Sequence, residues 1–133
     1  ESLAAMRPPR VRARVVALSG ELGAGKTTFV RGVLRGLGIR RRATSPTFIL
    51  MRAFPLRSAK SFRAVYHVDA YRIRHADELR RAGFAAWRAD PRLIILVEWP
   101  ERLPRLLPAN RIRVRLTHGR AENERTIVIA YSF

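Results

Sequence analysis

The chain has 133 residues, a formal charge of +17 and 47% apolar residues, and it contains no cysteine. This length and apolar content suit a single domain over residues 1–133, and the lack of cysteine excludes disulfides and thiolate metal sites. There is no run of about 18 uncharged apolar residues and no signal-peptide pattern, so we expect a soluble, cytoplasmic protein with no membrane contact.

The basic residues are almost all arginine. Lys26 and Lys60 are the only lysines, and the arginines are scattered along the chain without forming one tract. Two interpretations stay open: a solvated surface with a drifted composition, or a surface that meets RNA or an acidic protein. In a chain that otherwise avoids lysine, the lysine at position 26 stands out.

The first third of the sequence predicts a strand, a loop and a helix. Residues 11–19, "VRARVVALS", change from alternating to continuously apolar, as expected for a strand that enters a covered parallel sheet. A glycine-rich loop follows. The apolar residues of "KTTFVRGVLRGLG" then recur at helical spacing, and Gly38 is a plausible helix end.

The middle of the chain predicts a strand hairpin and a short helix. After Pro46 a β-rich run extends from Thr47 to Met51, residues 55–61 form a polar turn, and residues 62–71, "FRAVYHVDAY", form the next strand. The short helix contains "DELRRAGF", with Asp77 near its start and Gly83 past its end.

The last third predicts strands only. Residues 93–97, "LIILV", are the most strand-like run and Pro100 ends it. The segments "RIRVRL" and "RTIVIAYSF" alternate around the turn "THGRAENE", which predicts an antiparallel pair at a sheet edge.

The loop after the first strand has the spacing of a phosphate-binding loop. Residues 20–27, "GELGAGKT", fit the pattern G-x-x-x-x-G-K-[ST] between a strand and a helix. Glycines let successive backbone amides point inward around a phosphate, and the following helix adds the positive end of its dipole. Lys26 would reach the β and γ phosphates, and the Thr27 hydroxyl would bind Mg²⁺. Together the elements predict an α/β fold: one P-loop NTPase-like domain with a mixed, mostly parallel sheet flanked by helices and an antiparallel C-terminal pair.

Two acidic residues end apolar strands, where an open α/β sheet presents its site. Glu98 follows "LIILV" and Asp69 follows "VYHV". A carboxylate at either place can hold Mg²⁺ or orient an attacking water, although each could instead pair with an arginine. His67 and His75 lack a third neutral ligand at a matching spacing, so we interpret them either as structural or as residues that support the site side chains without binding a metal themselves.

Hydroxyl residues flank Pro46 on the connection after the loop helix. In P-loop switch proteins this connection carries a hydroxyl that senses the γ phosphate, although hydroxyls beside proline are also ordinary turn chemistry. The weak switch candidates are Thr44, Ser45 and Thr47.

The motifs in this order resemble one family. "GELGAGKTTFVRGVLRGLG", "SPTF", "HVDAYRI" and "VEWPERL", which lie between Val15 and Leu103, resemble the bacterial TsaE (YjeE) family, and the final "RTIVIAY" fits as well. The loop is generic, whereas its combination with HxDxYR and EWPE is specific. Family members usually begin with an additional segment whose threonine or serine lies near the adenine, and only "ESLAAMRPPR" precedes the first strand here, so we expect a shortened N-terminal segment.

The resemblance implies a small, slow ATPase that binds ATP or ADP with Mg²⁺. It implies TsaD-like and TsaB-like partners in the N6-threonylcarbamoyladenosine modification of tRNA, with tRNA contacted through that complex. Thr27 and Glu98 look like the Mg²⁺ ligands, and Lys26, Asp69 and Glu98 look like the catalytic residues, with the choice between Asp69 and Glu98 as the residue that orients water left open. The nucleotide-binding residues carried over by the motif are Glu21, Leu22, Gly23, Ala24, Gly25, Lys26, Thr27 and Thr28.

Two other functions compete with this one. A small-molecule kinase uses the same loop, but it needs an acceptor pocket and a lid, and there is little length for a lid between Tyr71 and Arg92. A basic RNA-binding domain could use the loop for a backbone phosphate, which would leave Asp69 and Glu98 without a task beside an anion.

Overall fold

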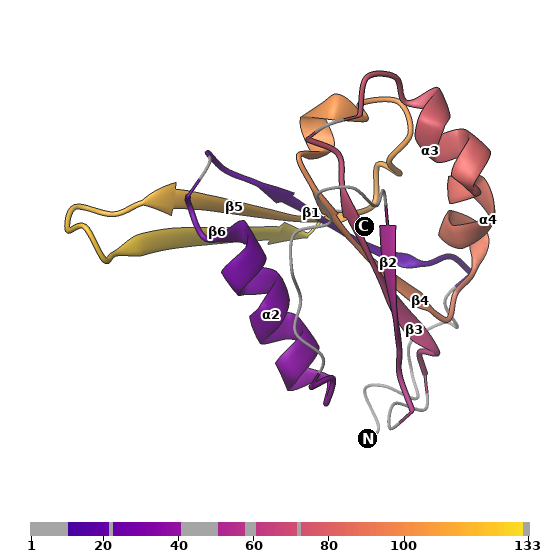
Figure 1. Cartoon of the computed structure of the whole chain (residues 1–133), viewed down its shortest axis with the longest axis horizontal. Coiled ribbons are helices and arrows are strands. Elements are labelled where there is room, and N and C mark those ends of the chain that lie inside the picture. Colours follow the sequence, from indigo (N-terminus) through magenta and orange to yellow (C-terminus); the bar gives the residue numbers. More distant parts are fainter. Residues whose placement is uncertain (1–10, 22, 41–50, 58–60, 72, 132–133) are drawn as a thin grey trace.

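Six strands form one sheet in the order β2-β3-β4-β1-β5-β6 (Figure 1). The structure is a computed structural model, and it describes residues 11–21, 23–40, 51–57, 61–71 and 73–131. The strands are β1 (Arg14–Ser19), β2 (Met51–Pro55), β3 (Ala64–Asp69), β4 (Leu93–Glu98), β5 (Ile112–His118) and β6 (Arg125–Tyr131).

The middle of the sheet is parallel and both outer pairings are antiparallel. β1 lies between β4 and β5 and is parallel to both, and β3 is parallel to β4. β2 joins β3 and β6 joins β5 in antiparallel register. Every residue of β4 is buried, which explains its unbroken apolar run, because helices or loops cover both faces of a central parallel strand. The predicted α/β fold with an antiparallel C-terminal pair is confirmed.

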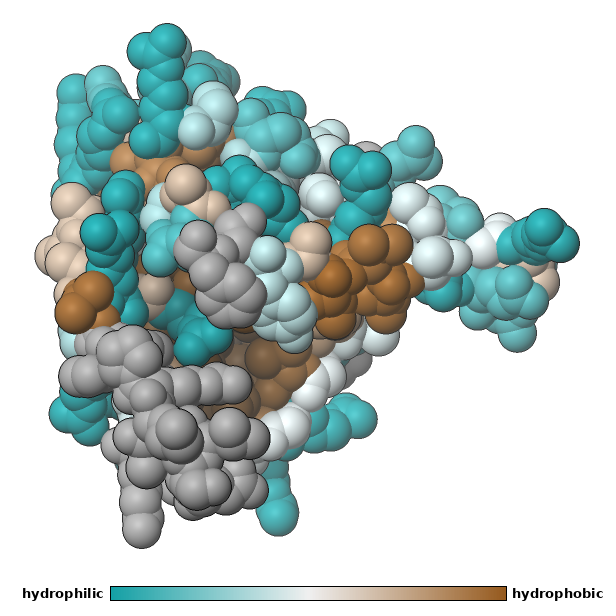
Figure 2. Space-filling view, turned by 180° about the vertical axis from the view of Figure 1, so that it is seen from behind, coloured by the Kyte–Doolittle hydropathy of each residue, from teal (hydrophilic) through white to brown (hydrophobic). Residues whose placement is uncertain are grey.

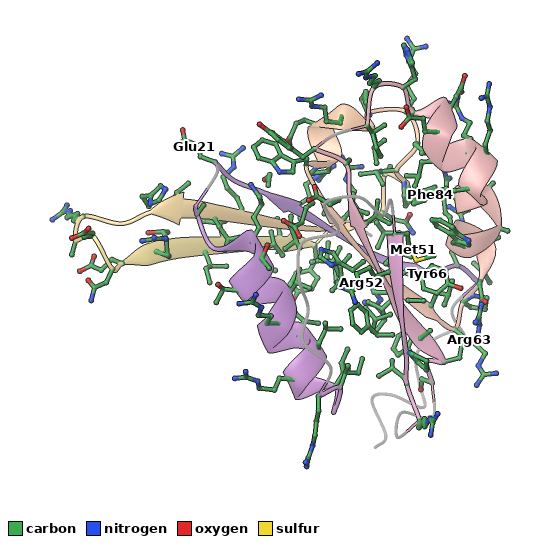
Figure 3. The ribbon with its side chains drawn as sticks, viewed as in Figure 1. Glu21, Met51, Arg52, Arg63, Tyr66 and Phe84 are labelled. Atoms are coloured by element: carbon green, nitrogen blue, oxygen red, sulfur yellow. The ribbon has the colours of Figure 1, made fainter. Side chains whose placement is uncertain are left out.

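Helices cover the two faces of the sheet separately. The helices are α2 (Lys26–Gly36), α3 (Asp77–Ala82), α4 (Phe84–Ala89) and the 3₁₀ turn η1 (Pro100–Arg102). On one face, Val30 and Leu34 of α2 pack with Val65 and Leu96 of the sheet. On the other face, α3 and α4 contribute Leu79 and Phe84 to a second cluster, and Phe84 and Tyr66 lie on this side (Figure 3).

Two element boundaries differ from the sequence prediction, and one helix was not predicted. Of the strand predicted at Thr47 to Met51 only the last residue lies in the described chain, where β2 runs from Met51 to Pro55, past the predicted end. Proline fits there because β2 is an edge strand. The loop helix ends at Gly36, and Gly38 follows in the left-handed region at φ +82°. A second short helix, α4, begins directly after Gly83 and was not predicted.

The β5–β6 hairpin extends beyond the rest of the molecule (Figure 1). Burial alternates along β5, so that Val114 and Leu116 are buried while Arg113 and Arg115 face solvent on the opposite side. β6 is exposed along its whole length. Apolar surface therefore appears where the hairpin joins the body (Figure 2).

In the described ranges, no helix combines the length and apolar character that crossing a bilayer requires.

Candidate functional site

The loop after β1 has the backbone that the glycine pattern predicts. Gly20, Gly23 and Gly25 have positive φ angles of 152°, 79° and 100°, which L side chains rarely adopt. Gly20 also has no room for a side chain, because a Cβ atom there would lie 2.5 Å from the backbone oxygen of Leu116. The loop therefore depends on glycine both for its conformation and for its close approach to β5.

The loop leads directly into α2, whose N-terminus has no side-chain cap. Gly25 is the N-cap residue in a left-handed conformation, and the first turn contains no acidic residue. The first backbone N–H groups of a helix have no partner within the helix, and they carry the positive end of its dipole. The start of α2 is consequently suited to an anion that comes from outside the helix.

Lys26 brings a buried ammonium group to the same place. Its side chain donates hydrogen bonds to the carbonyl oxygens of Gly20 and of Glu21, the latter at 3.3 Å. Among the described residues it forms no ion pair. Burial lowers the pKa of Lys26, and the negative charges of Glu98, Glu101 and Asp69 partly oppose this shift. A buried cation without an ion-pair partner among the described residues is suited to bind an anion.

Two carboxylates end neighbouring strands beside the loop. Asp69 of β3 is in register with Glu98 of β4, and Glu98 is in register with Leu18 of β1, just before the loop begins. Glu98 is 3% exposed, whereas Asp69 is half-buried and accepts a hydrogen bond from the backbone N–H of Tyr71 at 3.0 Å. The sheet thus brings together, along one edge, both acidic residues that the sequence singled out.

His67 is bonded to the buried carboxylate. Its Nε2 atom lies 2.5 Å from Oε2 of Glu98, and the imidazole is fully buried. This contact is compatible with a histidine that supports a site side chain, one of the two roles expected from the sequence, but the sequence does not identify Glu98 as its partner. The available signal was its spacing, because His67 and Asp69 lie two residues apart on a strand and so point to the same face.

Trp99 closes the group of residues around Lys26. Its ring centroid is 3.8 Å from the Lys26 Nζ atom, and the ring of Tyr71 lies against it at 4.9 Å. The backbone of Trp99 has φ +61°, the one positive value for a non-glycine residue in the described chain. Such strain costs about 1–3 kcal/mol and occurs preferentially at functional sites. An aromatic face beside an ammonium stabilises the cation.

The remaining predicted residues are only partly described. Ala24 is buried and Thr27 is half-buried. Thr28 is exposed in the first helical turn, and Glu21 is exposed in the loop that follows β1 (Figure 3). Leu22 and the switch candidates Thr44, Ser45 and Thr47 lie outside the described residues. Their predicted roles therefore stay predictions.

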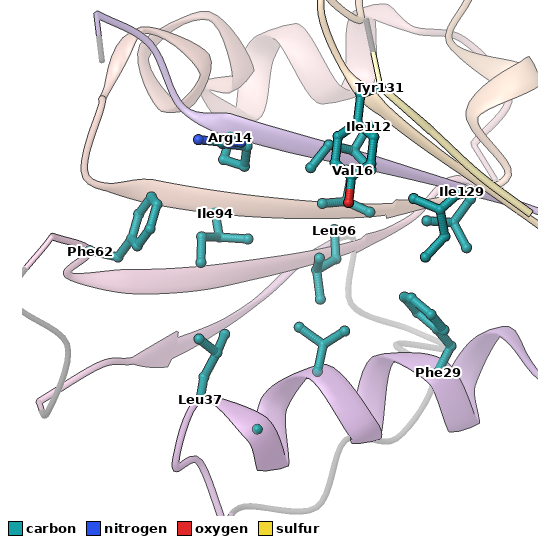
Figure 4. Close-up of a pocket in the computed structure, with 13 residues that line it drawn as sticks. Arg14, Val16, Phe29, Leu37, Phe62, Ile94, Leu96, Ile112, Ile129 and Tyr131 are labelled. Atoms are coloured by element: carbon teal, nitrogen blue, oxygen red, sulfur yellow. The ribbon is translucent and has the colours of Figure 1, made fainter. Parts of the chain in front are cut away.

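An apolar cavity of about 450 Å³ lies elsewhere, between α2 and the sheet (Figure 4). Its walls include Phe29, Val33, Ile94 and Ile129, and Arg14 is the one charged residue among them. A polyphosphate requires many donors and positive charge, so this cavity does not suit the anion that the loop would bind.

A comparison with known protein families gives a result that agrees with the loop, the two carboxylates and the order of the motifs. Residues 1–127 match the family model described as "Threonylcarbamoyl adenosine biosynthesis protein TsaE". The chain belongs to the TsaE family. The resemblance inferred from the sequence is thus confirmed.

Individual TsaE relatives give the same result. The TsaE protein of Streptomyces coelicolor is 43% identical over 103 residues, which cover 77% of this chain and 67% of that protein. The Haemophilus influenzae TsaE is 35% identical, over 80% of this chain and 65% of that protein. The crystal structure of YdiB from Bacillus subtilis superposes with a TM-score of 0.64 and 30% identity, over 97% of this chain and 74% of that one. In five of the curated TsaE relatives, the Streptomyces and Haemophilus proteins among them, the matched region spans 57–67% of that protein's length.

Proposed function

We propose that this protein binds ATP with Mg²⁺, hydrolyses it slowly, and thereby regulates TsaD-like and TsaB-like proteins during the N6-threonylcarbamoyladenosine modification of tRNA. The observation that carries the proposal is the position of Lys26. Its buried ammonium stands at the uncapped start of α2, beside the ends of β3 and β4 that carry Asp69 and Glu98. Family membership supplies the tRNA pathway.

The loop would bind the phosphates through its backbone. The positive φ angles of Gly20, Gly23 and Gly25 support a loop whose N–H groups converge on an anion, to which the α2 dipole adds. Lys26 would exchange its bonds to the loop carbonyls for the β and γ phosphates. Because a bound anion replaces weak dipolar partners with full negative charge, this exchange favours the charged form of Lys26.

The oxygen-rich residues suit Mg²⁺ better than a transition metal. Thr27, Asp69 and Glu98 offer hydroxyl and carboxylate oxygens, the hard ligands that Mg²⁺ prefers. The described residues contain no cluster of three or more His, Cys, Asp or Glu side chains fit to hold a metal alone. This agrees with Mg²⁺, which usually keeps several waters and takes other ligands from substrate phosphates. Thr27 and Glu98 would hold the ion, which neutralises phosphate charge when bound.

Asp69 is the better candidate for orienting the attacking water. It is half-buried at the strand end, where solvent can reach it, whereas Glu98 is buried and bonded to His67. In phosphoryl transfer the protein contributes mainly positioning and electrostatic stabilisation, so an incompletely assembled site hydrolyses slowly. We therefore expect partner proteins to increase the rate by completing the site.

The decisive experiment combines calorimetry with hydrolysis assays. We expect ADP and ATP to bind in an Mg²⁺-dependent manner, Lys26→Ala to abolish binding, and the low hydrolysis rate to rise when TsaD and TsaB are added. Hydrolysis that ignores these partners would contradict the regulatory role. Absence of Mg²⁺-dependent nucleotide binding, by the chain alone and with its partners, would refute the proposal as a whole.

Two further assays separate the competing functions: a screen of small acceptors with labelled ATP, and RNA binding at different salt concentrations. A kinase would transfer label from ATP to a small acceptor instead of releasing phosphate. The segment between Tyr71 and Arg92, which leaves little length for a lid, contains α3 and α4, and their packing on the face opposite to α2 argues against a kinase. An RNA-binding domain would show salt-dependent RNA affinity that ignores ATP and survives Lys26→Ala.

A further inference from the structure

His67 occupies a position on β3 where the packing calls for an apolar side chain. Strand alternation places it on the same face as Val65, which packs with Leu96 and α2. His67 itself is in register with Leu96 and has no exposed surface. A buried polar ring at such a site is costly unless its hydrogen bonds are satisfied. Its Nδ1 atom has no partner among the described residues. An aliphatic side chain would therefore serve the packing of the core at this position at least as well as histidine does.

The one hydrogen bond of the ring is to Glu98. A carboxylate oxygen accepts, so the Nε2–H of His67 donates to Oε2 of Glu98 over 2.5 Å. The register explains the geometry: Glu98 lies directly opposite Asp69 on β3, and His67 is the diagonal neighbour one pleat earlier. The bond gives the Glu98 carboxylate a defined hydrogen-bond donor beside the like charge of Asp69.

We propose that His67 is a positioning residue that holds the Glu98 carboxylate in the orientation needed to bind Mg²⁺. The inference deepens the proposed function and rests on it. Hydrogen bonds that orient metal-binding side chains typically change metal affinity by 10- to 100-fold when they are removed. The loop amides and Lys26 bind phosphate independently of this bond, so His67 affects the metal and leaves metal-free nucleotide binding unchanged.

Three substitutions test the role. His67→Leu keeps an apolar volume and removes the donor. His67→Gln keeps an N–H at the distance of Nε2, whereas His67→Asn carries its N–H one bond closer to the backbone and cannot reach Glu98. Mn²⁺ binding in the presence of ADP is measured by electron paramagnetic resonance of the free ion, and ADP binding without metal is measured by calorimetry.

We expect His67→Leu and His67→Asn to weaken Mn²⁺ binding by about 10-fold or more, with His67→Gln close to the unsubstituted protein. The affinity for ADP without metal should be equal in all of them. Val65→Ala is the matched control, since Val65 is fully buried on the same strand and face. It should lower the melting temperature without changing Mn²⁺ affinity.

The outcomes distinguish the two proposals. If the unsubstituted protein fails to bind Mn²⁺ with ADP, the proposed function fails and takes this inference with it. If it binds, and the folded His67→Leu protein binds Mn²⁺ equally well, only the inference is overturned. If His67→Leu does not fold, the comparison of Gln with Asn decides, because equal Mn²⁺ affinity in these two variants would also overturn it.

Discussion

The ammonium group of Lys26 lies 3.8 Å from the centroid of the Trp99 ring and donates to loop carbonyls, with no carboxylate bonded to it among the described residues. Burial lowers its pKa, which means that the surroundings disfavour the charged form. The loop thus holds an incompletely stabilised cation. Proteins commonly sacrifice some stability in this way at sites prepared for a ligand.

Replacing Lys26 by methionine should separate stability from binding. Methionine fills a similar volume without charge, so we expect the ligand-free melting temperature to rise by about 2–5 °C while nucleotide affinity falls at least about 100-fold. Calorimetry and thermal unfolding measure the two effects. Arg35→Met is the control on the exposed side of the same helix, and it should change neither quantity appreciably. A lower melting temperature for Lys26→Met would show that the carbonyl bonds and Trp99 outweigh the cost of burial.

Neutralising Glu98 should mainly weaken nucleotide binding, whereas neutralising Asp69 should mainly lower kcat. Glu98→Gln removes the charge that His67 holds in place, so we expect Mg²⁺-dependent nucleotide binding to weaken about 10-fold or more. Asp69→Asn should leave binding within about twofold and lower kcat by about 100-fold, as expected for a residue that orients water. Calorimetry with and without Mg²⁺, together with steady-state hydrolysis, distinguishes them. The reverse pattern would assign the metal to Asp69 and the water to Glu98.

The sequence predicted the parts of this site that depend on local pattern. The loop spacing located Gly20 to Thr27, and the two apolar runs located Asp69 and Glu98 because carboxyl ends of parallel strands share one edge. The predicted site lacked the contacts between strands. Such contacts depend on how neighbouring strands are aligned, and the sequence of one strand does not specify this alignment. The bond between His67 and Glu98 and the tilted ring contact of Tyr71 with Trp99 both depend on how β3 is aligned with β4.

The missed elements have a similar explanation. Gly83 was read as a helix end, which it is, but its left-handed backbone also starts α4 at the next residue. The helix-forming residues of "FAAWRA" were the available signal. Pro55 was read as the start of a turn, whereas it ends β2 because an edge strand tolerates a missing N–H. In both cases the local sequence allowed more than one structure, and the position of the segment in the fold determined which one forms.

Alanine substitutions at Gly20 and Gly23 should show how strongly the loop depends on space and on backbone conformation. Gly20→Ala places Cβ 2.5 Å from the Leu116 backbone oxygen, so the loop must move, and we expect a loss of about 2 kcal/mol or more together with weaker nucleotide binding. Gly23→Ala meets no atom within 4 Å and has only its φ of +79° to accommodate, which costs about 1 kcal/mol.

Gly32 provides the opposite control. It lies inside α2 with nothing within 4 Å of an added Cβ, so Gly32→Ala should raise stability by about 0.5–1 kcal/mol and leave binding unchanged. Urea unfolding gives the free energies, and calorimetry gives the affinities. Equal effects at Gly20 and Gly23 would show that the backbone near Leu116 yields easily.

Asp90 should control part of the acid stability of the fold, far from the loop. The backbone N–H of Arg92 and the side chain of Arg63 donate to it at 2.9 Å each, and these bonds lower the pKa of Asp90. Because the folded-state pKa is below the ordinary value, the stabilisation is fully present above about pH 4 and is lost as the pH falls through the folded-state pKa. We expect Asp90→Ala to cost about 1 kcal/mol at pH 7 and almost nothing near pH 2, measured by urea unfolding over this range. Arg63→Ala should cost less, because Arg63 is partly exposed and the amide of Arg92 would still hold the carboxylate. A pH-independent loss for Asp90→Ala would mean that its contribution is packing and not charge.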